Sequence, residues 1–147
     1  MKKKILVTRR LLIENEEKLK ELFDVKLNSK DELYTSDKII ELSKDCDGIL
    51  SAVTDQFNKD LIEKLSPSIK IIANFAVGFG NIDVNAAVKK NIVVTNTPEV
   101  LDDSTADISI LLLLGASRKV LEARRAAELQ NWKWSADFML GKQMSNK

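Results

Sequence analysis

Short apolar runs rich in β-branched residues alternate with amphipathic stretches through the first hundred residues, and this alternation constrains the fold more than any other feature. We expect strands at residues 4–8, 25–27, 48–51, 70–75 and 92–95. Stretches with helical spacing lie between them. Five strands joined by helices predict a parallel sheet with helices on both faces, and right-handed crossovers make 2-1-3-4-5 the simplest strand order. The predicted fold class is therefore α/β, a flavodoxin-like doubly wound parallel sheet.

Capping residues mark the ends of the expected helices. Ser36 is a good N-cap for the helix that precedes the third strand. Asp83 is expected to cap a helix over residues 84–90, which Asn91 would end in the left-handed conformation.

The pattern changes after residue 100. Residues 104–130 are typical of one long helix, and Ser104 and Asp107 are spaced as a capping box. Its first half, residues 108–114, is apolar nearly all round, which predicts burial on most sides. We expect two parts: a sheet domain over residues 1–100, and the long helix with an extended arm over residues 101–147.

Composition excludes several classes of protein. The 147 residues carry 23 basic and 22 acidic side chains, and a net charge of +1 gives no electrostatic case for a nucleic-acid partner. No apolar run approaches the length of a membrane span, and the run at residues 5–7 is too short for a signal peptide. The lone Cys46 cannot form an internal disulfide, which fits a reducing cytoplasm.

Ligands of open α/β sheets bind beyond the carboxyl ends of the strands. Three segments are expected there: residues 8–10, residues 51–54 and residues 76–83. In the last, Gly78 and Gly80 could form a turn whose N–H groups point outward, a nest suited to a carboxylate. The alternative is a turn in which the two glycines serve a positive φ and nothing else.

Two longer motifs carry a family resemblance. Residues 74–83 read Asn-Phe-Ala-Val-Gly-Phe-Gly-Asn-Ile-Asp, and residues 97–107 read Thr-Pro-Glu-Val-Leu-Asp-Asp-Ser-Thr-Ala-Asp. Together they resemble the substrate-binding part of the D-isomer-specific 2-hydroxyacid dehydrogenases, most closely the glyoxylate/hydroxypyruvate reductase branch. The resemblance implies that the amides of Val77 and Gly78 hold the carboxylate of a small 2-oxo or 2-hydroxy acid, and that Ser51 lines the same pocket.

The same resemblance assigns roles in the second part of the chain. It implies that Thr105 runs close to the nicotinamide of the cofactor, although a residue in a capping turn is an equal alternative. Trp134 and Phe138 resemble an arm that reaches a second subunit, which implies a homodimer; the alternative is a tail that packs on its own chain.

The groups that would reduce a 2-oxo acid are missing from these residues. The family uses NAD(P)H on a Gly-rich Rossmann turn, an arginine and a histidine. Here there is no histidine, and Gly78-Phe79-Gly80 lacks the third glycine of a dinucleotide motif. We therefore expect no nucleotide-binding domain, no cofactor bound to this chain alone and no catalytic residue in it. The chain would be the inactive N-terminal portion of such an enzyme, with apolar surface left open where a returning C-terminal segment would pack.

The alternative function is a non-catalytic module that binds a small carboxylate or serves dimerisation or regulation. A receiver domain needs an acidic pair after the first strand, and a flavodoxin needs a phosphate loop there; Arg9-Arg10 supplies neither. The pairs Asp45/Asp47 and Asp102/Asp103 are ordinary turn and cap residues. No metal site is predicted, since only carboxylates without calcium-loop spacing remain as ligands.

Overall fold

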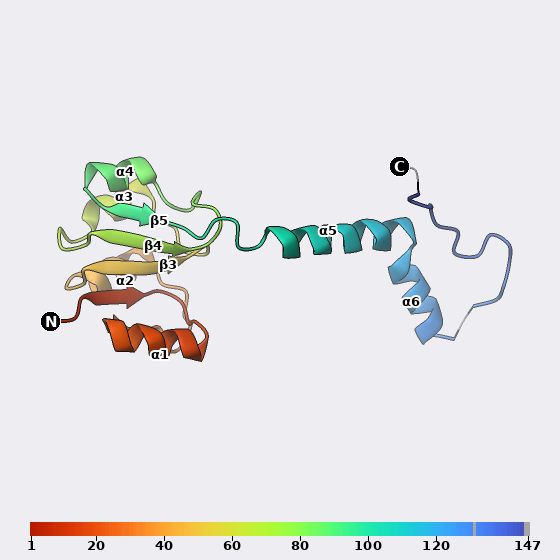
Figure 1. Cartoon of the computed structure of the whole chain (residues 1–147), viewed down its shortest axis with the longest axis horizontal. Helices are drawn as coiled ribbons and strands as arrows, with labels where there is room; N and C mark the ends of the chain where they lie inside the picture. Colours follow the sequence, from red (N-terminus) through yellow and green to blue (C-terminus); the bar gives the residue numbers. More distant parts are fainter. Residues whose placement is uncertain (131, 146–147) are drawn as a thin grey trace. The chain divides into compact units, whose positions relative to one another are not determined.

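The computed structural model describes residues 1–130 and 132–145 and divides into two units, Met1–Val100 and Leu101–Lys147. The first unit is a five-stranded parallel sheet in the order β2-β1-β3-β4-β5 (Figure 1). The predicted α/β class and strand order are confirmed. The strands are β1 (Lys4–Val7), β2 (Asp24–Lys26), β3 (Gly48–Ala52), β4 (Ile71–Phe75) and β5 (Val93–Thr95).

Helices cover the two faces of the sheet unequally. The connecting helices are α1 (Ile13–Leu22), α2 (Ser36–Ser43), α3 (Lys59–Lys64) and α4 (Val84–Lys89). Contacts run from α2 to α3 and from α3 to α4, and right-handed crossovers place α1 on the opposite face. The core lies under α2, α3 and α4, where apolar side chains of helices and strands are fully buried, among them Ile39, Ile49, Phe57, Ile62 and Ile72.

The ends of the helices follow from local sequence. The Asp83 carboxylate accepts a hydrogen bond from the Ala86 N–H at 2.9 Å, and Asn91 has a φ of 57°, so both predictions for α4 are confirmed. The cap of α2 is Thr35, whose hydroxyl accepts from the Lys38 N–H at 3.3 Å. The prediction of Ser36 was wrong by one residue because Thr35 already has the extended backbone and side-chain oxygen that a cap requires.

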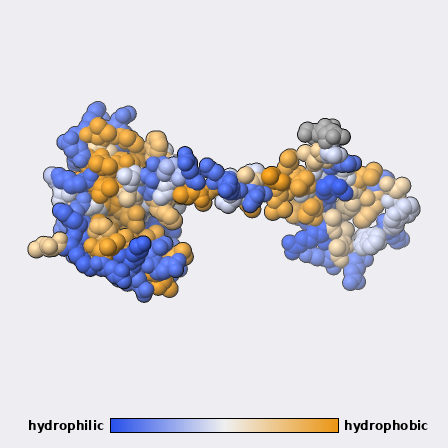
Figure 2. Space-filling model, viewed as in Figure 1, coloured by the Kyte–Doolittle hydropathy of each residue, from blue (hydrophilic) through white to orange (hydrophobic). Residues whose placement is uncertain are grey.

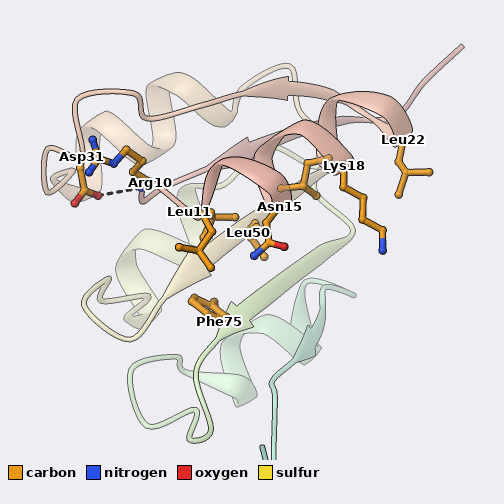
Figure 3. A pocket seen from close by; sticks show the side chains of 10 residues that line it. Arg10, Leu11, Asn15, Lys18, Leu22, Asp31, Leu50 and Phe75 are labelled. Carbon is orange, nitrogen blue, oxygen red and sulfur yellow. Dashed lines mark hydrogen bonds between the residues drawn. The ribbon is translucent and has the colours of Figure 1, made fainter.

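The α1 face of the sheet is largely open. No residue of α1 is buried, and Ile71, Phe75 and Val93 are exposed on β4 and β5. A groove of about 620 Å³ runs between α1 and the sheet, lined by apolar side chains that include Leu11, Leu50 and Phe75, with Arg10 and Lys18 also on its wall (Figure 3). The sheet domain therefore has open apolar surface along this groove.

The second unit holds two helices where one was predicted. Helix α5 (Asp102–Ser117) ends before Lys119, which has a φ of 54°, and α6 (Val120–Glu128) follows. The carbonyl of Ser117 accepts a hydrogen bond from the Lys142 N–H at 2.7 Å instead of continuing the helical pattern. The prediction of a single helix over residues 104–130 was wrong, because the segment that contains Lys142 binds the Ser117 carbonyl at the break.

A further expectation for this unit fails. Helix α5 begins at Asp102 with Leu101 as N-cap, and the Ser104 hydroxyl donates to the Leu101 carbonyl at 3.0 Å rather than forming a capping box. Within the second unit the side chains of residues 108–114 are exposed, and their burial against another surface stays a prediction. Within residues 1–130 and 132–145, no helix combines the length and apolar character needed to cross a membrane.

Candidate functional site

The loop between β4 and α4 offers a series of free backbone N–H groups. In the part of the chain that the structure describes, the N–H groups of residues 77–81 have no hydrogen-bond acceptor, whereas the Ile82 N–H returns to the Phe79 carbonyl at 3.0 Å. An unpaired backbone N–H is costly unless water or a ligand satisfies it. Successive N–H groups of this kind form concavities that bind anions.

A buried polar network lies beneath this loop. The Ser51 hydroxyl on β3 donates to the Asn74 side-chain oxygen on β4 at 3.1 Å, and both residues are buried. The Asn74 amide donates to the Gly78 carbonyl and to the Asn81 side-chain oxygen, each at 3.0 Å. The Asn81 amide continues to the carbonyls of Ala52 and Asp55. The structure thus brings Ser51 and the loop together through Asn74, with the Ser51 hydroxyl proton already engaged.

Gly78 and Gly80 do not serve a positive φ, which was the alternative interpretation of this turn. Neither Gly78 nor Gly80 has a positive φ, so the backbone does not require glycine there. A Cβ atom at either position would meet no atom of the chain within 4 Å. The missing side chains therefore leave open space beside the loop, which keeps the N–H groups accessible.

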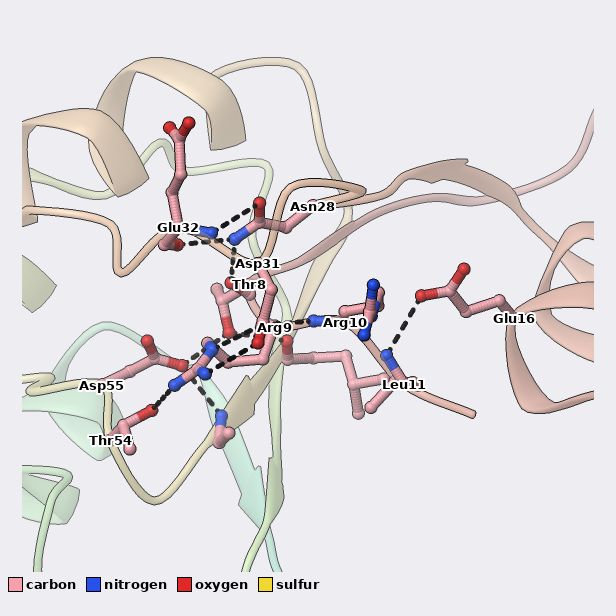
Figure 4. Close-up of polar contacts among 12 residues, drawn as sticks. Thr8, Arg9, Arg10, Leu11, Glu16, Asn28, Asp31, Glu32, Thr54 and Asp55 are labelled. Atoms are coloured by element: carbon pink, nitrogen blue, oxygen red, sulfur yellow. Dashed lines mark hydrogen bonds and ion pairs between the residues drawn. The ribbon is translucent and has the colours of Figure 1, made fainter. Parts of the chain in front are cut away.

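The loop after β1 is held by an ion pair. The Arg9 guanidinium donates to both carboxylate oxygens of Asp31, at 2.8 and 3.0 Å, and to the Thr54 hydroxyl at 2.7 Å (Figure 4). The hydrogen bond from Arg9 and a second one from the Arg10 N–H hold the pKa of the Asp31 carboxyl well below its ordinary value. Arg9 therefore joins three loops at the carboxyl edge of the sheet, and its charge is already paired.

Beside this ion pair lies a buried carboxylate that sequence reasoning missed. One Asp55 oxygen accepts from the Thr8 hydroxyl at 2.5 Å and from the Ala52 N–H at 2.8 Å (Figure 4). The other oxygen is buried without a partner among the described residues. Asn74 was missed as well, although a polar residue at an inward position of an apolar strand, two residues after Ile72, is a readable signal.

The site residues predicted in the second unit lie on its surface. Thr105 is exposed in the first turn of α5. Trp134 is 82% exposed, whereas the Phe138 ring stacks on Trp132 with centroids 6.0 Å apart. A cavity of about 300 Å³ lies between these rings and α6. Phe138 thus lies near its own helix, and the roles of Thr105, Trp134 and Phe138 stay predictions.

Comparison with known proteins now identifies the family. Residues 5–144 match the family model "D-isomer specific 2-hydroxyacid dehydrogenase, catalytic domain". The chain belongs to this family. A glyoxylate reductase of Korarchaeum cryptofilum is 43% identical over 144 residues, which cover 96% of this chain and 43% of that relative.

Solved dehydrogenase structures share the fold. A Polaromonas sp. JS6 66 protein described as an NAD-binding D-isomer specific 2-hydroxyacid dehydrogenase has a TM-score of 0.86 at 31% identity, covering 99% of this chain and 46% of that one. An NADPH-dependent glyoxylate/hydroxypyruvate reductase from Sinorhizobium meliloti, solved with NADP and malonate, has a TM-score of 0.74 at 31% identity, covering 90% and 40%. The chain spans less than half the length of these relatives.

The dehydrogenase family uses a nicotinamide dinucleotide, and the loop at residues 77–81 does not match the motif that binds one. The Gly-rich loop 77–81 leads into α4, a helix of six residues, and lacks the third glycine of the dinucleotide motif. The open space at Gly78 and Gly80 leaves room for a small anion beside the loop. No group of three or more potential metal ligands lies together within residues 1–130 and 132–145.

Proposed function

We propose that this chain is the substrate-binding part of an NAD(P)-dependent D-2-hydroxyacid dehydrogenase of the glyoxylate/hydroxypyruvate reductase type. Its ligand is the carboxylate of a small 2-oxo or 2-hydroxy acid, held by the N–H groups of Val77 and Gly78. The observation that carries the proposal is the series of N–H groups at residues 77–81 that have no acceptor among the described residues. They lie beside glycines whose missing side chains leave room for the acid.

The chemistry of the loop matches this ligand. A carboxylate accepts several N–H hydrogen bonds, and charge-assisted bonds of this kind are stronger than neutral ones. The relative from Korarchaeum cryptofilum is a glyoxylate reductase, and the Sinorhizobium meliloti structure holds malonate, a small carboxylate. Ser51 contributes through its hydrogen bond to Asn74, which lies directly beneath the loop.

Reduction itself needs groups that these 147 residues do not supply. A 2-oxo acid gains a hydride at its carbonyl carbon and a proton at its oxygen, and general acid catalysis usually falls to histidine. The chain contains no histidine, and its Gly-rich loop does not fit a dinucleotide. We therefore propose that the 147 residues alone bind the acid without reducing it, and that Thr105 lies near the nicotinamide in the whole enzyme.

The proposal is tested by titrating the ¹⁵N-labelled chain with glycolate and glyoxylate. We expect the amide signals of residues 77–81 to shift, with the largest changes at Val77 and Gly78. Glycolamide, which has the shape of glycolate without the charge, should leave them unchanged. The proposal fails if glycolate moves none of these amides or acts only on groove residues such as Arg10 and Lys18. With NADH and glyoxylate, the chain should show no turnover above the blank.

A non-catalytic carboxylate-binding module is the second candidate. It is favoured by two observations: the accessible N–H groups of residues 77–81, here called the anion loop, and the absence of histidine from these 147 residues. The nucleotide sequence beyond the Lys147 codon distinguishes the two. A Gly-x-Gly-x-x-Gly segment followed by an arginine and a histidine would support the dehydrogenase, whereas their absence from every reading frame would support the module.

We further propose that the chain forms a homodimer in the cytoplasm. Five consecutive apolar residues, Ile110 to Leu114, cover the full circumference of α5, and they are 46–65% exposed. Figure 2 shows hydrophobic surface along the later part of this helix. A helix that is apolar on all sides is normally buried. A second copy of the chain is the partner that the family resemblance indicates for this surface, and the free thiol of Cys46 fits a reducing compartment.

A further inference from the structure

We infer that two asparagines outside the anion loop, Asn74 and Asn96, are positioning residues that set the direction of its N–H groups. This inference rests on the proposed function, because it explains how the carboxylate site is kept in its binding conformation. Each asparagine fixes one peptide plane of the loop from the side that the ligand does not occupy.

The first plane is held by Asn96, which follows β5. Its side-chain amide donates to the Val77 carbonyl at 2.6 Å. The carbonyl and N–H of a trans peptide point in opposite directions, since the peptide unit is planar. Binding the Val77 carbonyl at Asn96 therefore directs the Gly78 N–H away from Asn96.

The second plane is held by Asn74 on β4. Its amide donates to the Gly78 carbonyl at 3.0 Å, which directs the Phe79 N–H away from the buried network. Asn74 is itself fixed on its other side, because its side-chain oxygen accepts from the Ser51 hydroxyl at 3.1 Å and from the Asn81 amide at 3.3 Å. Only 2% of Asn74 is exposed, so water does not compete for these hydrogen bonds.

The glycines make this positioning necessary. Gly78 and Gly80 have no side chains that could anchor the loop, and glycine is the residue with the greatest backbone freedom. The N–H groups of residues 77–81 make no bond within the described chain that could hold them in place. Two of the loop carbonyls are instead bound by the side chains of Asn74 on β4 and Asn96 just after β5. The direction of the N–H groups is therefore set before the acid binds.

The test replaces each asparagine and measures the loop with and without ligand. The variants are Asn74→Ala and Asn96→Ala, and the matched control is Asn28→Ala. Asn28 is also a buried asparagine whose amide donates to two carbonyls, those of Thr8 and Glu32, each at 2.7 Å, but it makes no bond to the loop.

Backbone order parameters of the ligand-free protein test the positioning directly. We expect about 0.85 at residues 78 and 79 in the unchanged chain and values below about 0.6 in both loop variants. The dissociation constant for glycolate should rise about fivefold to tenfold, the effect of losing one hydrogen bond. Asn28→Ala should lower stability while changing neither quantity.

The outcomes separate this inference from the proposed function. One outcome is that the loop becomes mobile in the variants while the unchanged chain binds no glycolate. This result would support the positioning role and overturn the proposed ligand. A rigid loop in both variants would overturn the positioning role even if glycolate binds. Should Asn74→Ala fail to fold, Asn96→Ala still decides, because Asn96 is only partly buried and lies outside the core.

Discussion

At Gly78, one added methyl group should affect folding and binding in opposite directions. Gly78→Ala places a Cβ in open space at an ordinary φ, so the lower entropy of the unfolded chain should raise the free energy of unfolding by about 0.4–1 kcal/mol. The same methyl occupies the space beside the Gly78 N–H and should weaken glycolate binding about tenfold. Urea unfolding and an amide-shift titration measure the two effects.

Gly80→Ala is the matched control for this substitution. Gly80 has the same open surroundings and ordinary φ but lies two residues further along the loop. It should gain similar stability and keep its affinity for glycolate. Equal affinities for all three proteins would exclude the carboxylate from the immediate surroundings of Gly78.

Substitutions of Asp83 test whether its carboxylate serves as the N-cap of α4. Its side chain accepts from the Ala86 N–H, so Asp83→Ala should lower the free energy of unfolding by about 1 kcal/mol, the usual cost of losing an N-cap. Asp83→Asn keeps an acceptor oxygen and should restore most of that loss. Urea unfolding of both variants is the measurement. If Asp83→Asn were as unstable as Asp83→Ala, the charge rather than the cap would be what matters.

Sequence reasoning succeeded at single residues where the interaction is local. Asp83 and Asn91 act within one helical turn, and both were predicted correctly. Asn74 acts across strands and its partner Ser51 is 23 residues away, so its role depends on a strand pairing that residue types alone do not specify. The glycines of residues 77–81 are visible in the sequence and led to the proposal of a carboxylate site, but their role in leaving open space required the backbone conformation.

At the scale of elements, an ion-pair network joins the first two strands to the segment before β3. Asp45 pairs with Lys4 of β1 at 2.7 Å and with Lys26 of β2. The hydrogen bonds from Lys26 and Lys4 lower the pKa of the Asp45 carboxyl, and a hydrogen bond from Lys3 lowers that of Asp47. Since β2 is a three-residue edge strand, these contacts supplement a short ladder.

This network predicts a loss of stability in acid. A carboxyl whose pKa is lower in the folded state stabilises fully above its unfolded pKa of about 3.9, and that contribution is lost as the pH falls toward the folded pKa. The free energy of unfolding should therefore decline below about pH 4. Asp45→Asn should show a smaller decline, measured by urea unfolding at several pH values. Glu17→Gln, which removes an exposed carboxylate with no ion pair among the described residues, should keep the full decline.

The break between α5 and α6 shows where element prediction fails. Residues 104–130 contain no proline and have helix-forming composition, so the local pattern continues through Lys119. The break coincides with a contact from far along the chain, where a Cβ on Gly141 would lie 2.6 Å from the Ser117 carbonyl oxygen. Such a close approach depends on the path of the arm, which no periodicity in the helix records.

At the scale of the whole molecule, the alternation of strands and helices was sufficient to predict the sheet and its order. It was not sufficient to predict that, within residues 1–100, α1 is the one helix on its face of the sheet and leaves Phe75 and Val93 exposed. Apolar residues on buried strands look the same whether one face or both are covered by the same chain. The same limit applies to α5, whose apolar sequence predicts burial without saying by which surface.

The proposed homodimer rests on the apolar circumference of α5. A charge at its centre should break the proposed homodimer, because Leu111→Glu removes a leucine worth about 1.5–3 kcal/mol on burial and introduces a carboxylate without a partner. The dimer dissociation constant should rise about tenfold to a hundredfold. Sedimentation velocity over a range of concentrations measures it.

Val88→Glu on α4 is the control for this substitution, since Val88 and Leu111 are both 64% exposed on helices of the two units. If exposure alone promoted association, both variants would dissociate equally. If the α5 surface is the interface, only Leu111→Glu shifts the chain toward monomer, while circular dichroism of both variants stays like that of the unchanged chain. A monomeric unchanged chain at micromolar concentration would refute the dimer, and the apolar surface of α5 would then need a different partner.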